Sequence, residues 1–254
     1  MTLFDMHCHL GFAVNAAALA RAFGEAGGGA LCCTVEPDEY ERLQRVLPGS
    51  ASVRLGLGLH PWWLANGRCG EADVARCERL AEEAAFIGEV GLDFGPRNAA
   101  SRDGQLDAFE RICAVAGEAG GKAISIHSVR AAKEVLDVLE RTGCVSAGKG
   151  KASCACILHW YSGPSDQLSR AIRLGCYFSL GESSLATRRG REYARIIPAD
   201  RLLLETDLPE EACNSYDFAR IGESLGRALA GIEEVRGEPV ADAIERNSRR
   251  ILDR

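Results

Sequence analysis

The feature that most constrains the fold of this sequence is a regular alternation of short apolar runs and longer helix-like segments. We expect the short runs to form strands over residues 2–6, 30–34, 52–60, 85–93, 122–127, 154–159, 176–180 and 201–207. The longer segments predict helices over residues 16–26, 37–47, 71–84, 103–120, 131–142, 166–174, 188–196, 217–229 and 239–252. Such alternation is typical of parallel strands joined by helical crossovers. Eight units within 254 residues predict an α/β protein, a single (β/α)₈ barrel domain over residues 1–254 with an extra C-terminal helix.

All five histidines fall at or just after the end of an expected strand. His7 and His9 are separated by one residue, and side chains two apart on a strand point to the same face. His60, His127 and His159 each follow an apolar run directly. A parallel barrel brings the carboxyl ends of its strands to one face, where active sites lie. We therefore expect the histidines to gather at one site, although a His-x-His pair alone fits two ordinary polar strand-end residues equally well.

Two carboxylates are expected at the same face. Glu89 lies inside the apolar run 85–93, and Asp207 follows three consecutive leucines. A carboxylate buried in such a run needs a partner, so an exposed loop position explains neither residue well. The shared barrel face therefore predicts a metal centre whose ligands are His7, His9, Glu89, His127, His159 and Asp207. His60 is assigned to substrate binding, without metal ligation.

The overall charge limits the classes of partner. A net charge of −6 argues against a protein that coats nucleic acid or an anionic membrane through its overall field. No apolar run approaches the ~20 residues that span a bilayer, and no secretory signal is evident. The 11 cysteines are spread through a large chain, which favours reduced thiols and a cytoplasmic protein. We expect a monomer with no obligate protein partner and no membrane association.

Six ordered motifs resemble those of the TatD-type metal-dependent deoxyribonucleases of the amidohydrolase superfamily. They are Asp5-Met6-His7-Cys8-His9-Leu10, Gly58-Leu59-His60-Pro61, Ile87-Gly88-Glu89-Val90-Gly91-Leu92-Asp93, Ile126-His127-Ser128, His159-Trp160-Tyr161-Ser162-Gly163 and Leu204-Glu205-Thr206-Asp207-Leu208-Pro209. The resemblance implies a TIM barrel, one or two divalent metal ions and hydrolysis of phosphodiester bonds. It further implies that His7, His9, Glu89 and Asp207 hold the first metal, and that Glu89, His127 and His159 hold the second.

Elementary chemistry agrees with the implied ligand sets. The two oxygens of Glu89 can bridge two cations, and such a pair can activate a water and stabilise both oxygens of an in-line displacement. Asp207 would orient and deprotonate that water, so Glu89 and Asp207 are the predicted catalytic residues. Imidazole and carboxylate ligands suit Zn, Mn or Fe, and Mg less well.

The sequence departs from the family pattern where the substrate cleft is shaped. Gly11 stands where the family usually has aspartate, Ile112 stands where a glutamine is common, and the segment after Pro209 is short. Because this short segment leaves little loop to contact a DNA duplex, we expect the protein to hydrolyse DNA ends or short single strands. Arg188 and Arg189 are candidate phosphate contacts, or else part of a solvated basic helix face.

Further candidates remain open. Trp62 is a candidate for stacking on a base, with ordinary loop packing as the alternative. A different enzyme class, an amidohydrolase acting on a small cyclic amide or lactone, usually needs a lysine at a strand end, whereas Lys122 begins its strand. The third possibility is a metal-binding scaffold without catalysis.

Overall fold

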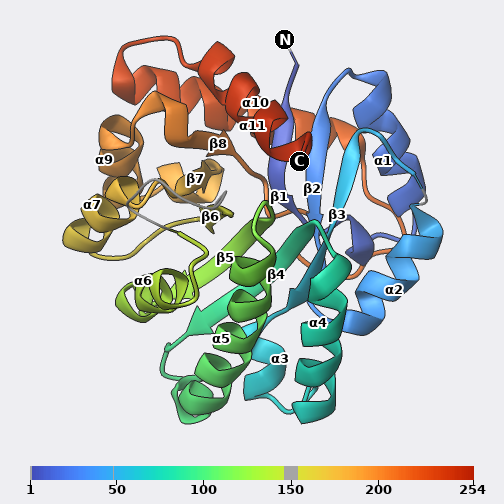
Figure 1. Cartoon of the computed structure of the whole chain (residues 1–254). Helices are drawn as coiled ribbons and strands as arrows, with labels where there is room; N and C mark the ends of the chain where they lie inside the picture. Colours follow the sequence, from blue (N-terminus) through green and yellow to red (C-terminus); the bar gives the residue numbers. More distant parts are fainter. Residues whose placement is uncertain (1, 48, 146–153) are drawn as a thin grey trace.

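The apolar runs form the strands of one parallel sheet in sequential order. The computed structural model describes residues 2–47, 49–145 and 154–254. The strands are β1 (Phe4–Cys8), β2 (Gly29–Cys33), β3 (Val53–Leu59), β4 (Phe86–Asp93), β5 (Ala123–Val129), β6 (Ala155–His159), β7 (Tyr177–Leu180) and β8 (Leu202–Leu204). Each strand pairs in parallel with the next, in the order β1 to β8. The predicted (β/α)₈ barrel is thereby confirmed, with the strands at the centre of Figure 1.

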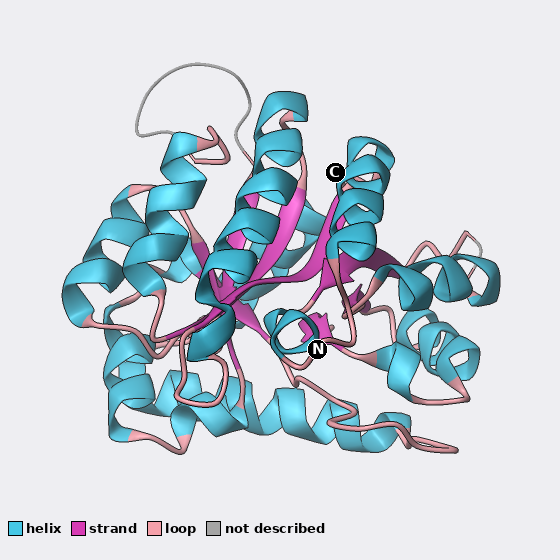
Figure 2. Cartoon of the chain, turned by 90° about the horizontal axis from the view of Figure 1, so that it is seen from below, coloured by secondary structure: helices cyan, strands magenta, loops and turns pink. Residues whose placement is uncertain are grey.

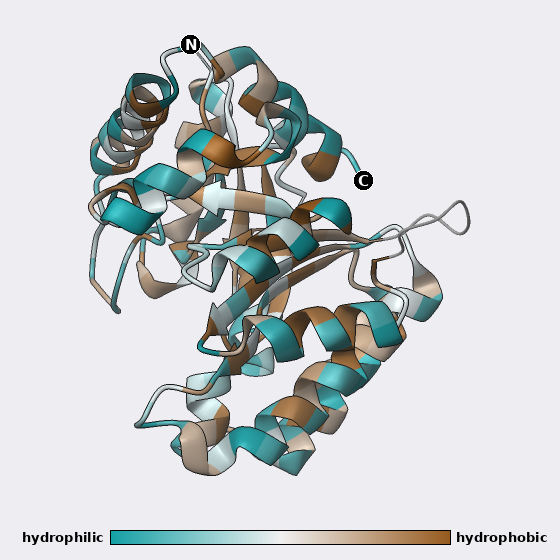
Figure 3. Ribbon diagram, turned by 90° about the vertical axis from the view of Figure 1, so that its left-hand side faces the viewer, coloured by the Kyte–Doolittle hydropathy of each residue, from teal (hydrophilic) through white to brown (hydrophobic). Residues whose placement is uncertain are grey.

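The helices surround the strands (Figure 2). They are α1 (Ala16–Glu25), α2 (Pro37–Val46), α3 (Pro61–Ala65), α4 (Glu71–Glu83), α5 (Arg102–Ala119), α6 (Ala132–Arg141), α7 (Ser165–Arg173), α8 (Glu182–Leu185), α9 (Arg188–Ile196), α10 (Phe218–Arg236) and α11 (Ala241–Leu252). Short 3₁₀ turns lie at η1 (Leu10–Phe12), η2 (Ala99–Ser101) and η3 (Ala199–Arg201). Figure 3 shows the strands as largely hydrophobic, while the helices alternate hydrophobic and hydrophilic residues, as expected for helices packed on one side.

The structure differs from the sequence-based expectation after β3. Residues 61–65 form the short helix α3, where we expected a loop. Proline is favoured at the first helical position, and the Nδ1 atom of His60 accepts a hydrogen bond from the backbone N–H of Trp62 at 3.1 Å. The side chain of His60 thus caps this helix and fixes its own orientation at the same time.

The seam between the first and last strands is closed at the carboxyl face. The backbone N–H of Asp207 donates to the carbonyl of His7 at 3.0 Å, and the N–H of His9 donates to the carbonyl of Leu208 at 2.9 Å. The buried Asp5 carboxylate accepts from the N–H of Thr206 at 3.1 Å and from its hydroxyl at 2.6 Å. These bonds hold the backbone segments that carry His7, His9 and Asp207 next to each other.

The hydrophobic core has two parts. The larger cluster lies between the strands and the surrounding helices. The smaller one collects the first residues of several strands, including Phe4, Phe86 and Tyr177, together with Ile251 and Leu252 of α11. Because these residues begin their strands, this cluster lies at the amino end of the barrel. The opposite end is left for polar side chains.

Two further expectations concern the cysteines and the membrane. All eleven cysteines are free, and ten of them are buried. Among the described residues, no helix combines the length and the apolar character that crossing a bilayer would need.

Candidate metal centre

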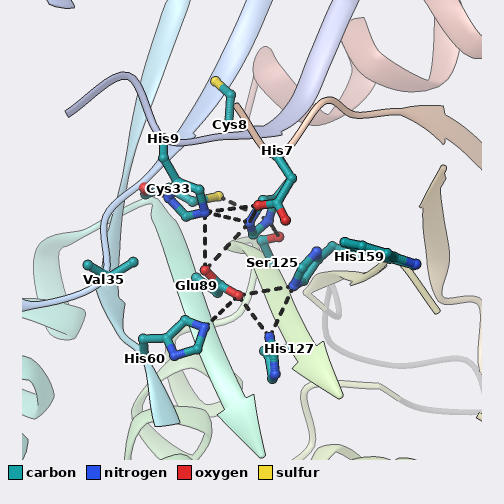
Figure 4. A network of polar contacts seen from close by, with 12 residues as sticks. His7, Cys8, His9, Cys33, Val35, His60, Glu89, Ser125, His127 and His159 are labelled. Carbon is teal, nitrogen blue, oxygen red and sulfur yellow. Dashed lines mark hydrogen bonds and ion pairs between the residues drawn. The ribbon is translucent and has the colours of Figure 1, made fainter. Parts of the chain in front are cut away.

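The predicted ligands converge at the carboxyl ends of the strands. His7 lies in β1, Glu89 in β4, His127 in β5 and His159 at the end of β6. The remaining predicted ligands, His9 and Asp207, follow β1 and β8, and His60, predicted to contact the substrate, follows β3. All five histidines and Glu89 are buried, whereas the Asp207 side chain is 31% exposed. Figure 4 shows the Glu89 carboxylate at the centre of the histidines.

The first group of donor atoms surrounds the Oε2 atom of Glu89. The Nε2 atoms of His7 and His9 lie 3.6 and 3.3 Å from it, and 3.3 Å from each other. The Oδ1 atom of Asp207 lies 3.4 and 3.1 Å from the same two nitrogens. Four ligands at ~2.0–2.2 Å from a common tetrahedral centre are separated by about 3.3–3.6 Å, from the geometry of zinc sites. The spacing of this group therefore fits one cation.

Hydrogen bonds on the far side of the rings set the tautomer of the histidines. The Nδ1 atom of His9 lies 2.9 Å from the carbonyl oxygen of Cys33, which can only accept. A neutral His9 therefore carries its proton on Nδ1 and offers a lone pair at Nε2, as a metal ligand requires. The Nδ1 atom of His7 lies 2.7 Å from the hydroxyl of Ser125, which can accept a hydrogen bond from Nδ1 in the same tautomer but can also donate.

A second group gathers at the other oxygen of Glu89. The Oε1 atom lies 2.9 Å from Nδ1 of His127 and 3.1 Å from Nε2 of His159, and these nitrogens are 3.4 Å apart. The outer nitrogen of His127, Nε2, faces the Asp93 carboxylate at 3.5 Å. That carboxylate favours a proton on Nε2 and a free lone pair on Nδ1, the usual arrangement of a carboxylate, a histidine and a metal.

His60 also reaches this group, with its Nε2 atom 2.9 Å from Oε1 of Glu89. Its Nδ1 atom already accepts from the N–H of Trp62, so a neutral His60 carries its proton on Nε2. In this tautomer His60 donates a hydrogen bond and has no lone pair directed at the cluster. His60 nevertheless forms a possible donor group with Glu89 and His127, so its assignment to substrate binding without metal ligation stays a prediction.

The electrostatics of the cluster follow from this crowding. Burial opposes charge on Glu89, but the adjacent His60, His127 and His159 outweigh it and lower its pKa well below its ordinary value. Burial also opposes charge on His127, yet its contacts with Asp93 and Glu89 raise its pKa to about 9.

The pKa values of the two histidines in the first group, His7 and His9, shift in opposite directions. Burial, aided by nearby His159, lowers the pKa of His7 to about 4. For His9, contacts with Asp207 and Glu89 overcome the opposing burial and raise the pKa well above its ordinary value. The same contact with His9 helps to lower the pKa of Asp207 to about 2, against the effect of burial. Asp207 is therefore ionised at neutral pH.

A cavity of about 660 Å³ opens above the cluster. Its lining consists of His9, Phe12, Val35, His60, Trp62, Trp63, Glu89, His127, Ser128, Val129, His159, Trp160, Ser162, Asp207 and Glu210. Among these described lining residues there is no lysine or arginine. Trp62 lines the cavity as a substrate contact would, and its indole N–H donates to Asp93 at 2.5 Å.

The predicted arginine contacts are placed differently. Arg188 and Arg189 are exposed and do not belong to the lining of the cavity. Arg189 instead donates to the carbonyl of Ser162, a lining residue, at 2.9 Å. Their contact with phosphate stays a prediction that this arrangement does not favour.

Sequence reasoning assigned no role to two residues that shape the site, Asp93 and Trp160, and expected for Glu205 only a supporting or structural role. Asp93 links Trp62 to His127, Trp160 lines the cavity, and the buried Glu205 accepts a hydrogen bond from the Trp160 backbone. Only their adjacency to predicted ligands or apolar runs could have indicated them. Gly11 also has a structural account, because a Cβ atom there would lie 2.1 Å from Oε1 of Glu39, whose side chain fills that space.

Comparisons with known proteins identify the family of the chain. The family model described as "TatD related DNase" matches residues 4–253. The "3'-5' ssDNA/RNA exonuclease TatD" of Pantoea vagans is 33% identical over 69% of the chain and 64% of that relative, slightly under two thirds of its length. The protein of the same name from Enterobacter lignolyticus is 30% identical over 76% of the chain and 72% of the relative.

Solved structures show the same fold. The TatD homologue YJJV of Escherichia coli superposes with a TM-score of 0.79 at 23% identity, over 99% of this chain and 98% of that one. A TatD family hydrolase from Entamoeba histolytica gives a TM-score of 0.72 at 13% identity, over 98% and 97% of the two chains. With its family model spanning nearly the whole sequence, the chain belongs to the TatD-related DNase family of metal-dependent hydrolases.

Proposed function

We propose that this protein is a divalent-metal-dependent phosphodiesterase that acts on DNA ends or short single strands. The observation that carries the proposal is the position of Glu89, whose two oxygens each face a separate set of donor atoms. In this arrangement His7, His9, Asp207 and Glu89 would hold one ion, and Glu89 with His127 and His159 would hold another. When bound, two such ions polarise the phosphate and make a water acidic enough to attack it.

The side chains have distinct roles in the proposed reaction. Asp207 directs Oδ1 at the histidines, and its partly exposed carboxylate leaves Oδ2 to orient the attacking water and accept its proton. Glu89 keeps the two sets of donors at a fixed separation. His60 is set to donate from Nε2 to an oxygen of the substrate when that oxygen displaces Glu89 as its partner.

The ligand chemistry and the chain itself support further details. Nitrogen and carboxylate donors favour Zn, Mn or Fe over Mg. All proposed ligands come from one chain, and eight sequential strands form one sheet, which supports a monomer with a single domain over residues 1–254. The eleven free thiols support a reducing, cytoplasmic location. The names of the TatD relatives support nucleic acid as the substrate class.

The amidohydrolase alternative receives less support from the site. The Nζ atom of Lys122 donates to the carbonyls of Glu82 and Ala84, at 3.1 and 2.7 Å, near the start of β5. No lysine occurs among the described residues of the cavity lining, so a carboxylated lysine bridge has no candidate there. The scaffold alternative would have to explain why every predicted donor atom is in place.

The test is a hydrolysis panel with protein loaded with Mn or Zn. Labelled single-stranded and duplex oligonucleotides, and a set of cyclic amides and lactones, are offered at fixed metal concentration. We expect stepwise cleavage of single strands, loss of cleavage in His159→Ala, and retention of it in Ser162→Ala, which alters a lining residue outside the donor groups. Cleavage of amides or lactones alone would replace the proposal by the amidohydrolase reading, and no hydrolysis at all by the scaffold.

A further inference from the structure

All three tryptophans of the chain line the cavity. Two of them, Trp62 and Trp160, remain 47% and 40% exposed, although large apolar side chains are normally covered. The other exposed large apolar residues among the described part of the chain, Val14, Val46 and Ile196, lie outside the cavity. Exposed indoles beside the candidate metal centre therefore call for a ligand that covers them.

Trp160 is held in a backbone conformation that bulky residues rarely adopt. Its φ is +39°, in the left-handed region that disfavours a large side chain. The backbone N–H of Trp160 points at two acceptors, the carbonyl of Ser179 at 3.2 Å and Oε1 of Glu205 at 3.1 Å. Glu205 is 2% exposed and also accepts a hydrogen bond from the hydroxyl of Ser179. Strain of this kind persists where the surroundings enforce it, and it is concentrated at functional sites.

The position of the indole is set relative to the second donor group. Trp160 directly follows His159, whose Nε2 atom lies 3.1 Å from Glu89. It lines both the main cavity and an adjoining recess of about 240 Å³. The lining of that recess includes Arg220, which lies over the Tyr216 ring, and Arg227, which is paired with Glu182. A ligand whose phosphate reaches the metal centre therefore has Trp160 within the same enclosure.

The charges of the cavity indicate what part of a ligand Trp160 contacts. The described lining carries the carboxylates of Glu89, Asp207 and Glu210 and no lysine or arginine. Apart from the metal ions, the lining thus offers no cation to the phosphates of a nucleic acid. Aromatic side chains instead bind bases through their faces, and this stacking does not depend on base sequence. Within the main cavity, contacts beyond the metal ions are therefore expected to be made with the bases, and the arginines of the adjoining recess are left for phosphates outside it.

We propose that Trp160 is a nucleobase-stacking residue of this cavity and that Glu205 is the positioning residue that fixes it. The inference rests on the proposed phosphodiesterase function and adds to it the part of the substrate that is recognised. Trp62, pinned by Asp93 through its indole N–H, offers a second aromatic surface in the same cavity.

The test compares two short single-stranded oligonucleotides, one complete and one with abasic residues at both ends. The terminal linkages are methylphosphonates, which resist hydrolysis, so that affinity is measured on metal-loaded protein by fluorescence anisotropy. The wild type is expected to bind the complete strand about 5- to 150-fold more tightly, equivalent to about 1–3 kcal/mol at 1.4 kcal/mol per factor of ten.

Two variants of Trp160 distinguish the effect of losing the indole ring from the effect of disturbing the fold. Trp160→Gly removes the indole and accepts a φ of +39° without strain, so a folded protein without the ring is obtained. Its preference for the complete strand should fall at least fivefold or disappear, while Trp160→Phe should keep most of it. Ile196→Ala, at an exposed apolar residue outside the cavity, is the matched control and should keep the full preference.

The role of Glu205 has its own readout. Glu205→Ala removes the acceptor of the Trp160 N–H and should lower the preference as Trp160→Gly does, whereas Glu205→Gln retains an acceptor oxygen and should restore it. A wild type without preference, or a Trp160→Gly protein with the full preference, overturns the proposal. If the preference depends on Trp160 but no phosphodiester is cleaved, the stacking site stands and the proposed function fails.

Discussion

Replacement of Glu89 by glutamine should remove one of the two metal ions that the proposed function assigns to the site. The wild-type carboxylate presents Oε2 to His7 and His9, and Oε1 to His127 and His159. An amide of the same shape keeps one ligand oxygen and replaces the other by an NH₂ group, which cannot bind a cation. Glutamine can therefore complete only one donor set, whichever way its amide turns.

The thermal effect of this loss can be worked out from linkage. An ion present at 100 times its dissociation constant stabilises the folded state by about 2.7 kcal/mol. For a protein of this size, 1 kcal/mol corresponds to about 2–4 °C in melting temperature. Adding metal at that concentration should therefore raise the melting temperature of Glu89→Gln by about 5–11 °C less than that of the wild type. Turnover should be nearly abolished, because the proposed reaction uses both ions.

The assay is elemental analysis after dialysis, followed by thermal unfolding with and without added Mn or Zn. The wild type should hold two equivalents and the variant at most one. Glu210→Gln is the matched control, because it exchanges a carboxylate for an amide in the same cavity but outside the donor groups. Two tightly held equivalents in Glu89→Gln would refute the bridging role.

Three other changes test different parts of the site. Asp207→Asn should lower turnover far more than metal content, because His7, His9 and Glu89 remain; near-normal turnover at saturating metal would exclude Asp207 as the base. Gly58→Ala would place a Cβ atom 1.6 Å from the carbonyl oxygen of Thr34, so both the free energy of unfolding and metal affinity should fall, as measured by urea denaturation and metal titration. Binding to single strands should show a log–log salt slope below about 0.7, the value for one neutralised phosphate, since no lysine or arginine occurs in the described lining; a slope near 2 would instead indicate contacts such as Arg188 and Arg189.

The sequence predicted the fold and the gathering of the histidines because both depend on local signals. An apolar run followed by His127 or His159 marks a strand and its carboxyl end, and the barrel then brings those ends together. The hydrogen-bond partner of the outer nitrogen of each imidazole could not be predicted in this way. The carbonyl of Cys33 meets His9 only because β1 and β2 pair with Cys8 opposite Cys32, a register that the sequence does not specify.

The same limit explains the assignments that changed in detail. His60 was assigned to substrate binding from the sequence, and this assignment stays a prediction. The contact of its Nδ1 atom with the Trp62 N–H of α3 could not be predicted from the sequence. Trp160 gave no periodic signal, since its conformation depends on acceptors from β7 and the segment after β8. Arg188 and Arg189 were near the site in sequence but lie on α9, outside the cavity.

The central position of Glu89 depends on glycines that carry no chemistry themselves. A Cβ atom on Gly88 would lie 2.5 Å from the carbonyl oxygen of Gly56, and one on Gly58 would overlap the carbonyl of Thr34. Without these side chains, the end of β2 reaches across β3, and the N–H of Glu89 donates to the Thr34 carbonyl at 3.2 Å. The pairing of β4 shifts register just there, between Ile87 and Glu89. The glycines of β3 and β4 thus allow the backbone packing that directs the Glu89 carboxylate toward both sets of histidines. The position of this predicted ligand therefore depends on these glycines.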